Sequence, residues 1–163
     1  MTYYDVTGAS PAEIHASIED SGPWSDWLRG NAQAHVRSSV TYNFHFQSWT
    51  DGGCVVIPET ASPVTFQYEV LLPRWVDGED ASRRTVDWWL ETIHETVWHE
   101  GHHIELYESV LPAMNEAVMT GSCHSVSADL QTLAFEAHRL NCEFDLAEYG
   151  FERGLTLESC LSQ

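Results

Sequence analysis

The residues best suited to chemistry lie together in the middle of the chain, in the sequence His99-Glu100-Gly101-His102-His103. His99 and His103 are four residues apart, so on a helix both imidazoles project from one face, about one turn apart. At this spacing two ring nitrogens can reach a single Zn²⁺ at about 2.0–2.1 Å. Glu100 is rotated about 100° around the helix, where it can lie beside the open position of the metal and accept a proton from zinc-bound water. The segment therefore fits the HExxH pattern of a hydrolytic zinc site.

Three other residues around the motif carry weaker signals. A glycine inside a helix costs about 1 kcal/mol relative to alanine, so Gly101 predicts a close approach to the helix near the site. His94 and His102 have no histidine four residues away, and we expect them on the surface or behind the ligands rather than on the metal. The alternative for the whole motif is a solvated, histidine-rich helix face without a metal.

A hydrolytic zinc site usually takes a third protein ligand and leaves one coordination position for water. A second helical segment offers a stripe at i, i+4, i+7 and i+11, which consists of His138, Cys142, Asp145 and Tyr149. Glu136 and Glu148 are further carboxylates on the same segment. Spacing alone does not choose among these six residues. The alternative is that the stripe only packs against the first helix.

Two long helices must position these side chains. Apolar residues recur at three- and four-residue steps from Val86 to Ile104, which predicts a helix over about residues 82–110 that Pro112 ends or kinks. A second helix follows Ser122-Cys123, and Gly150 is its expected stop. The stripe that this second helix is expected to bury consists of Val126, Leu130, Leu133, Ala137, Leu140 and Phe144.

The N-terminal half predicts one short helix and a small sheet. Ser10 caps the helix, Glu13 completes a capping box, and the helix ends near Asp20. Strands are predicted by alternating or continuous apolar residues over 36–46, 54–57 and 64–72, with a turn at 51–53. Three strands in close succession favour an antiparallel meander. The expected fold class is therefore α+β, a small antiparallel sheet with two long helices, in one domain that spans the whole chain.

The net charge of the chain limits the classes of partner that we expect. Seven arginines, with no lysine, face 25 aspartates and glutamates, so the formal net charge is −18. A field of this sign repels phosphate backbones and anionic lipids, which argues against nucleic-acid and membrane partners. A cationic or neutral peptide or small molecule is electrostatically easier to bind. No apolar run reaches 18 residues, so no membrane-spanning helix is expected, and the seven tryptophans indicate core packing more than a partner surface.

The four cysteines, Cys54, Cys123, Cys142 and Cys160, allow three disulfide pairings. The N-terminus has neither the basic nor the apolar region of a signal peptide. We therefore expect the cytoplasm, where the thiols stay reduced. If the chain is a processed form of a secreted protein, disulfides become the expectation instead.

Four segments together resemble a bacterial family of secreted zinc-dependent proteases (domain of unknown function 922). They are Tyr4–Gly8, Leu72–Trp75, His99–His103 and the tail from Phe144 to Gly154. The resemblance covers nearly the whole chain, and it implies a zincin-like α+β fold in which the first long helix carries HExxH. The protease activity of that family is itself inferred mainly from the motif. The resemblance therefore implies the fold more strongly than the function.

The tail departs from this family. Phe144-Asp145, Gly150 and Gly154 fit its pattern, but Glu148 and Tyr149 stand near the positions where the family has threonine and histidine. If that histidine is the third ligand of the family, this chain has lost it. The stretch from Asp145 to Gly150 is also similar to the Asp-x-x-Tyr-Gly element of the aspzincins, with one extra residue. That resemblance implies that Asp145 is the third zinc ligand and that Tyr149 stabilises the oxyanion; a tyrosine that ligates the metal directly is the rival assignment.

Three functions are consistent with these features. In the first, the chain is a zinc metallopeptidase in which the two motif histidines and Asp145 hold zinc, Glu100 activates water, and Tyr149 or His102 assists the oxyanion. In the second, a zincin-like metalloenzyme acts on a small molecule in a biosynthetic pathway. In the third, the chain is a binding module without catalysis, although a structural metal site has no need of Glu100.

Overall fold

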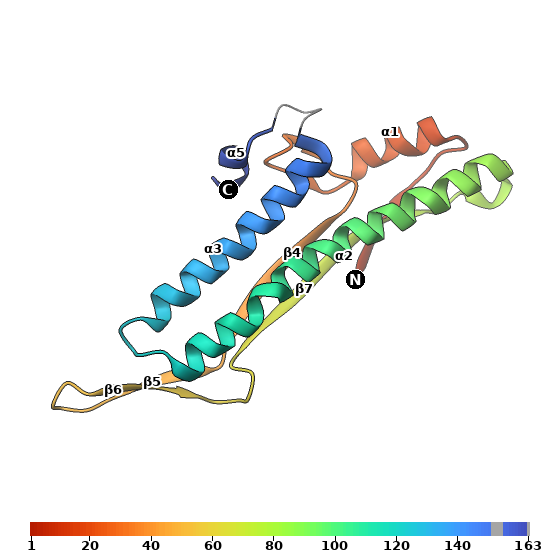
Figure 1. Ribbon diagram of the computed structural model, residues 1–163. Coiled ribbons are helices and arrows are strands. Elements are labelled where there is room, and N and C mark those ends of the chain that lie inside the picture. Colours follow the sequence, from red (N-terminus) through yellow and green to blue (C-terminus); the bar gives the residue numbers. More distant parts are fainter. Residues whose placement is uncertain (151–154, 163) are drawn as a thin grey trace.

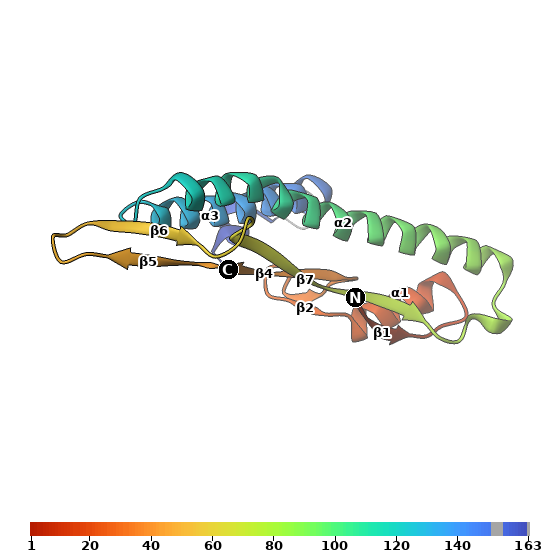
Figure 2. The same cartoon turned by 90° about the horizontal axis from the view of Figure 1, so that it is seen from below.

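A mixed arrangement of short strands and long helices makes up the computed structural model, which describes residues 1–150 and 155–162. The strands are β1 (Thr2–Val6), β2 (Trp24–Ser25), β3 (Gly30–Asn31), β4 (His35–Tyr42), β5 (Phe44–Ser48), β6 (Cys54–Pro58) and β7 (Val64–Trp75). The helices are α1 (Pro11–Ser21), η1 (Gly78–Asp80), α2 (Arg83–Thr120), α3 (Val126–Asp145), η2 (Leu146–Gly150) and α5 (Leu157–Leu161). Helices α2 and α3 lie side by side on one side of the strands, and the molecule is elongated (Figures 1 and 2). The α+β prediction is confirmed.

Strand β7 is the centre of a three-stranded sheet with the order β1-β7-β4. It is antiparallel to β4, with Val36 opposite Val70, and parallel to β1. The predicted antiparallel meander is therefore wrong, because the sheet is mixed and β6 does not join it. The chain leaves the sheet at Asn43, whose N–H donates to the Pro63 carbonyl (2.7 Å) and whose carbonyl accepts from the Glu59 N–H (2.8 Å). These two bonds break the predicted strand 36–46 into β4 and β5.

Strands β5 and β6 form a separate antiparallel hairpin that extends beyond the ends of the helices (Figure 2). Its turn lies at the predicted place, residues 51–53, where Gly52 has a φ of +89° that side-chain-bearing residues rarely adopt. A disulfide between Cys54 and Cys123 ties the hairpin to the turn between α2 and α3.

Helix α2 has 38 residues, which corresponds to a length of about 57 Å. Its N-terminus is capped by Ser82, whose hydroxyl accepts from the Thr85 N–H. The predicted end of this helix near residue 110 is wrong, since α2 continues past Pro112 for eight more residues. Proline removes one backbone hydrogen bond, but Met114 and Val118 beyond it are fully buried in the main core against α3 and the strands. Burial of this last part of the helix offsets the lost bond.

Helix α3 buries most of the stripe expected for it. Val126, Leu130 and Ala137 lie in the core that also contains residues of α2, β6 and β7, and Leu133 and Leu140 pack against it. Phe144, the last member of the expected stripe, lies among histidine rings instead, as described below. The α-helix ends at Asp145, and the chain continues as the π-helix η2, which reaches the predicted stop, Gly150.

Helix α1 lies where it was predicted and packs over the N-terminal end of α2. The predicted capping box is not formed, because the Glu13 carboxylate accepts from the Ala9 N–H (2.8 Å) instead of the Ser10 N–H. The Ser10 hydroxyl accepts from the Glu13 N–H, and Ile14 and Ile18 are buried with Val6. Three tryptophans, Trp75, Trp88 and Trp89, pack against this cluster. Trp24, Trp49 and Trp98 are at least half exposed. The expectation that tryptophans serve the core therefore holds for only part of the set.

All four cysteines are paired, Cys54 with Cys123 and Cys142 with Cys160. The expectation of reduced thiols is wrong, and the structure selects one of the three possible pairings. Disulfides persist in oxidising compartments and are rare in the cytosol, so they weigh against the cytoplasmic prediction. Within the described residues, no helix combines the length and the apolar character needed to cross a membrane.

Candidate metal centre

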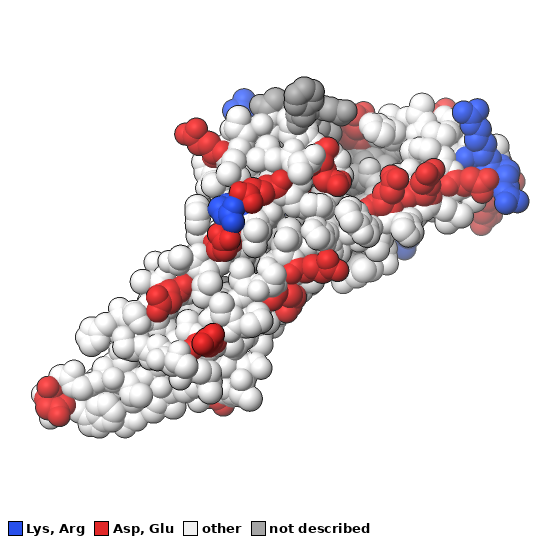
Figure 3. Space-filling model, viewed as in Figure 1, with Lys and Arg blue, Asp and Glu red and all other residues white. Residues whose placement is uncertain are grey.

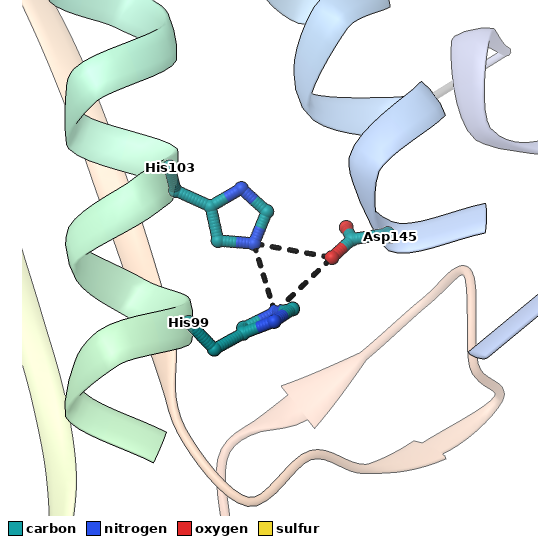
Figure 4. Close-up of side chains that lie close together, drawn as sticks. All are labelled: His99, His103 and Asp145. Carbon is teal, nitrogen blue, oxygen red and sulfur yellow. Dashed lines mark hydrogen bonds and ion pairs between the residues drawn. The ribbon is translucent and has the colours of Figure 1, made fainter. Parts of the chain in front are cut away.

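Two histidines of α2 and one aspartate at the end of α3 bring three ligand-type atoms together. His103 Nε2 lies 3.1 Å from His99 Nε2 and 3.1 Å from Asp145 Oδ1, and His99 Nε2 lies 3.3 Å from the same Oδ1. The side chains point toward one another from the two helices (Figure 4). They are largely shielded from solvent, with exposed fractions of 12% for each histidine and 24% for the aspartate. These three residues could hold a metal ion.

The size of this triangle fits a tetrahedral zinc site. Two ligand atoms that each lie 2.0–2.1 Å from a tetrahedral ion are about 3.3 Å apart. The three observed distances run from 3.1 to 3.3 Å. These distances are therefore compatible with one cation that would be held by all three atoms.

Asn141 fixes which nitrogen of His103 faces this triangle. The Asn141 side-chain amide donates to the Ala137 carbonyl at 2.8 Å, so its oxygen must point the other way, toward His103 Nδ1 at 2.7 Å. His103 Nδ1 therefore carries a proton and donates it to Asn141, which leaves a lone pair on Nε2 when the ring is neutral. Such a buried partner is the usual orienting group behind a metal-bound histidine. Asn141 was not predicted from the sequence, although it lies four residues before Asp145 on the same face of α3.

The charges of the triangle are coupled. Burial alone would raise the pKa of the Asp145 carboxyl, but contacts with His103 and His99 outweigh it and hold that pKa below its usual range. Burial would lower the pKa of His103, but Asp145, Asn141 and Glu100 together raise it. The carboxylates of Asp145 and Glu100 therefore favour a positive charge at His103.

Glu100 lies beside the triangle as a buried carboxyl group. It is 6% exposed, and it accepts a hydrogen bond from the backbone of Val36 in β4. Its other oxygen, Oε2, is buried and has no hydrogen-bond partner among the described residues. Burial raises the pKa of Glu100, and the opposing effect of His103 and His99 is smaller. A polar atom without a partner in this position is available to a water molecule or a substrate.

Phe144 holds the histidine rings of α2 in place. Its ring centroid lies 4.8 Å from that of His99, 4.5 Å from that of His102 and 5.2 Å from that of His103. Tyr149, in η2, also contacts His99, with its ring centroid 5.2 Å from that of His99 and 43% of its surface exposed. Aromatic contacts thus restrict the rotamers of both potential ligands.

Three of the other third-ligand candidates are directed elsewhere. Cys142 is bonded to Cys160 and is no thiolate. His138 lies with its ring nitrogens 3.8 and 4.0 Å from the Cys142 sulfur. Glu136 forms a two-point ion pair with Arg139. None of the three belongs to the group that could hold a metal ion.

Glu148 lies behind His99 rather than beside Asp145. Its Oε2 is 3.6 Å from His99 Nδ1, the nitrogen that faces away from the triangle. Nδ1 is buried and forms no hydrogen bond with any residue that the structure describes, and 3.6 Å is too long for one. Gly154, part of the tail that resembles the bacterial family, lies outside the described residues.

The remaining residues around the motif are placed on the outside of α2. A Cβ atom added to Gly101 would meet no other atom within 4 Å, so no close approach among the described residues accounts for this glycine. His102 stacks on Trp98 and bonds to Glu105. His94 is exposed, as predicted for a residue that is not a ligand.

The triangle opens into a cleft of about 870 Å³. Its walls are α2, α3, η2 and the segment 25–36, which leads into β4. Glu100 and Tyr149 line it together with the three residues of the triangle. Cys142 and Cys160 line it too, so the disulfide that joins α5 to α3 forms part of its wall.

The model of one protein family, described as "Bacterial protein of unknown function (DUF922)", matches residues 1–147. This match covers most of the chain, and the chain belongs to that family. It includes His99, Glu100, His103 and Asp145. Searches of curated proteins and of solved structures found no match.

Proposed function

We propose that this member of the DUF922 family is a zinc-dependent peptidase in which His99, His103 and Asp145 hold the ion. The observation that carries the proposal is the triangle of their ligand atoms, with edges of 3.1–3.3 Å. Asn141 supports it, because it directs the lone pair of His103 Nε2 into the triangle. Two imidazoles and one carboxylate suit zinc better than calcium or magnesium, which prefer oxygen ligands alone.

The chemistry follows from the residues around the ion. Zinc, when bound, supplies a Lewis acid that polarises a carbonyl group and lowers the pKa of water. Glu100 accepts the proton of the attacking water and passes it to the leaving amine, and the burial that raises its pKa moves it closer to neutral pH, where one group can serve as base and then as acid. Tyr149 donates a hydrogen bond to the oxyanion that forms on the substrate carbonyl.

The two disulfides support a site of action in an oxidising compartment. We propose that the peptidase works outside the cytoplasm, where thiols are oxidised.

A comparison of zinc-loaded wild-type protein with its Glu100→Gln variant tests the peptidase proposal. Both proteins are incubated with a mixed peptide library, and the products are read by mass spectrometry. We expect cleavage by the wild type to fall at least 100-fold in Glu100→Gln, because loss of a general base typically costs this much. Zinc content is measured on the same samples and serves as the control, since Glu100 is not a ligand. Absence of cleavage by zinc-loaded wild type would contradict the proposal.

The size of the cleft favours one second candidate. A volume of about 870 Å³ is within the range of sites that enclose small molecules, so the same zinc chemistry can serve a non-peptide substrate. Retention of zinc with no cleavage of any peptide in the library would favour this candidate over the first.

A further inference from the structure

A line of acidic residues on α2 leads to the metal centre. Asp87, Glu91 and Glu95 are each four residues apart, and His99 and His103 continue the same spacing. Successive residues at this spacing are neighbours on a helix, and the line that they form turns by about 40° around the helix axis at each step. Figure 3 shows acidic side chains in a row over the N-terminal half of α2. We call Asp87, Glu91 and Glu95 the acidic track.

Two members of the acidic track lack a partner of opposite charge. Asp87 pairs with Arg83 at 3.3 Å. Glu91 and Glu95 form no hydrogen bond or ion pair through their side chains within residues 1–150 and 155–162. Like charges four residues apart destabilise a helix, so the pair weakens α2 unless a cation lies against it.

The acidic track reaches the cleft through Glu95. Glu95 and Trp98 line both the cleft and a neighbouring hollow of about 400 Å³, whose other walls are Glu91 and His94. An extended ligand that leaves the cleft beside Glu95 passes directly over the two unpaired carboxylates and the exposed indole of Trp98.

The charge of the cleft favours a cation. Four carboxylates line it, those of Glu95, Glu100, Asp145 and Glu148, and no arginine is among its lining residues in the described part of the chain. A divalent ion at the triangle would offset two of these four negative charges, so the cleft would keep a net charge of −2. The buried, unpartnered Oε2 of Glu100 is an independent sign that the cleft receives a polar ligand.

We propose that the substrate of this cleft is a basic peptide, whose cationic side chains at alternate residues bind Glu95 and Glu91. One step of four residues along α2 rises about 6 Å, and alternate residues of an extended peptide are about 6.6 Å apart. Two arginines or lysines separated by one residue therefore match the two carboxylates. The indole of Trp98, which is 56% exposed and lines the same hollow, can contact a guanidinium or ammonium group. This inference rests on the proposed function and names the substrate class of the same site.

Binding to zinc-loaded Glu100→Gln protein, measured by calorimetry at low salt, tests this proposal without turnover. The probes are an uncleaved peptide with arginine at two alternate positions and the same peptide with citrulline, which keeps the shape of arginine without its charge. We expect the arginine peptide to bind more tightly, by up to about five-fold for each carboxylate, and this preference to shrink in 1 M NaCl.

Second-site variants show where the preference originates. Glu95→Gln, added to the Glu100→Gln background, should remove part of it, and Glu91→Gln with Glu95→Gln most of it. Glu116→Gln is the matched control, because it removes the same charge from an exposed position of α2, about 30 Å from Glu95. A general attraction to the acidic protein would respond equally to Glu116→Gln and Glu95→Gln.

The proposal is overturned if the arginine and citrulline peptides bind equally, if neither binds, or if Glu116→Gln has the same effect as Glu95→Gln. The binding assay uses a variant without the proposed base and measures no cleavage. If the wild type fails to cleave peptides, the proposed function is contradicted, but the binding data still test the preference for a basic peptide.

Discussion

Replacement of Asn141 by alanine tests whether the triangle is a metal site with an oriented histidine. The Asn141 oxygen accepts from His103 Nδ1 at 2.7 Å, and Asn141 is 6% exposed, so water cannot easily replace it. Loss of the acceptor leaves a buried N–H without a partner, which costs about 1–3 kcal/mol. Loss of such an outer partner typically weakens metal binding 10- to 100-fold, or about 1.4–2.8 kcal/mol. We expect the zinc dissociation constant of Asn141→Ala to rise within this range.

Competition with a chromophoric chelator measures this constant for wild type, Asn141→Ala and Asn141→Asp. The aspartate variant keeps an acceptor for His103, so it should bind zinc at least as tightly as the wild type. Circular dichroism of each metal-free protein controls for loss of fold, because the Asn141 amide also donates to the Ala137 carbonyl. A dissociation constant for folded Asn141→Ala within two-fold of the wild-type value would refute the reasoning.

Three further outcomes concern stability. Gly101→Ala should raise the free energy of unfolding by about 1 kcal/mol in urea titrations, because the added Cβ meets open space; a loss of stability would show that the helix is closely approached there. Replacement of Cys54 and Cys123 by serine should cost about 4 kcal/mol in the same assay, because their bond closes a loop of 69 residues, and an unchanged unfolding midpoint would contradict it. Burial raises the pKa of Tyr4 to about 12 from an ordinary value near 10, so the folded state favours the neutral phenol. This preference adds to the free energy of unfolding below pH 10, and the contribution is lost as the pH rises from 10 through 12. Tyr4→Phe should flatten this alkaline limb in a pH series of thermal unfolding, and an identical slope in both proteins would be the contrary result.

The part of the site that the sequence predicts is the local part. His99 and His103 share a helix face because of their spacing alone. This prediction therefore does not depend on how the rest of the chain folds. Asp145 needed the resemblance of the tail to the aspzincins, since spacing left six candidates. Asn141 was missed because a single amide on a face expected to pack carries no periodic signal. Its role appears only when α3 is placed against α2.

The errors about the fold also arise from contacts between residues that are distant in the sequence. Strand pairing depends on contacts between distant residues, and alternation over 36–46 did not reveal that the bonds of Asn43 to Pro63 and Glu59 divide the strand. Pro112 was given its average effect on an isolated helix, whereas the burial of Met114 beyond it decides the outcome in the folded chain. Local rules placed the elements, and tertiary contacts set their ends and their partners.

Metal content per chain tests the central claim most directly. The protein is purified without chelator or histidine tag, supplied with zinc, dialysed and measured by elemental mass spectrometry, beside a His99→Ala/His103→Ala variant and an Asp145→Ala variant. We predict close to one zinc per wild-type chain, none in the double histidine variant and a clear loss in Asp145→Ala. Wild-type protein that retains no zinc, or a double variant that retains as much as the wild type, would contradict the assignment of the triangle as a zinc site.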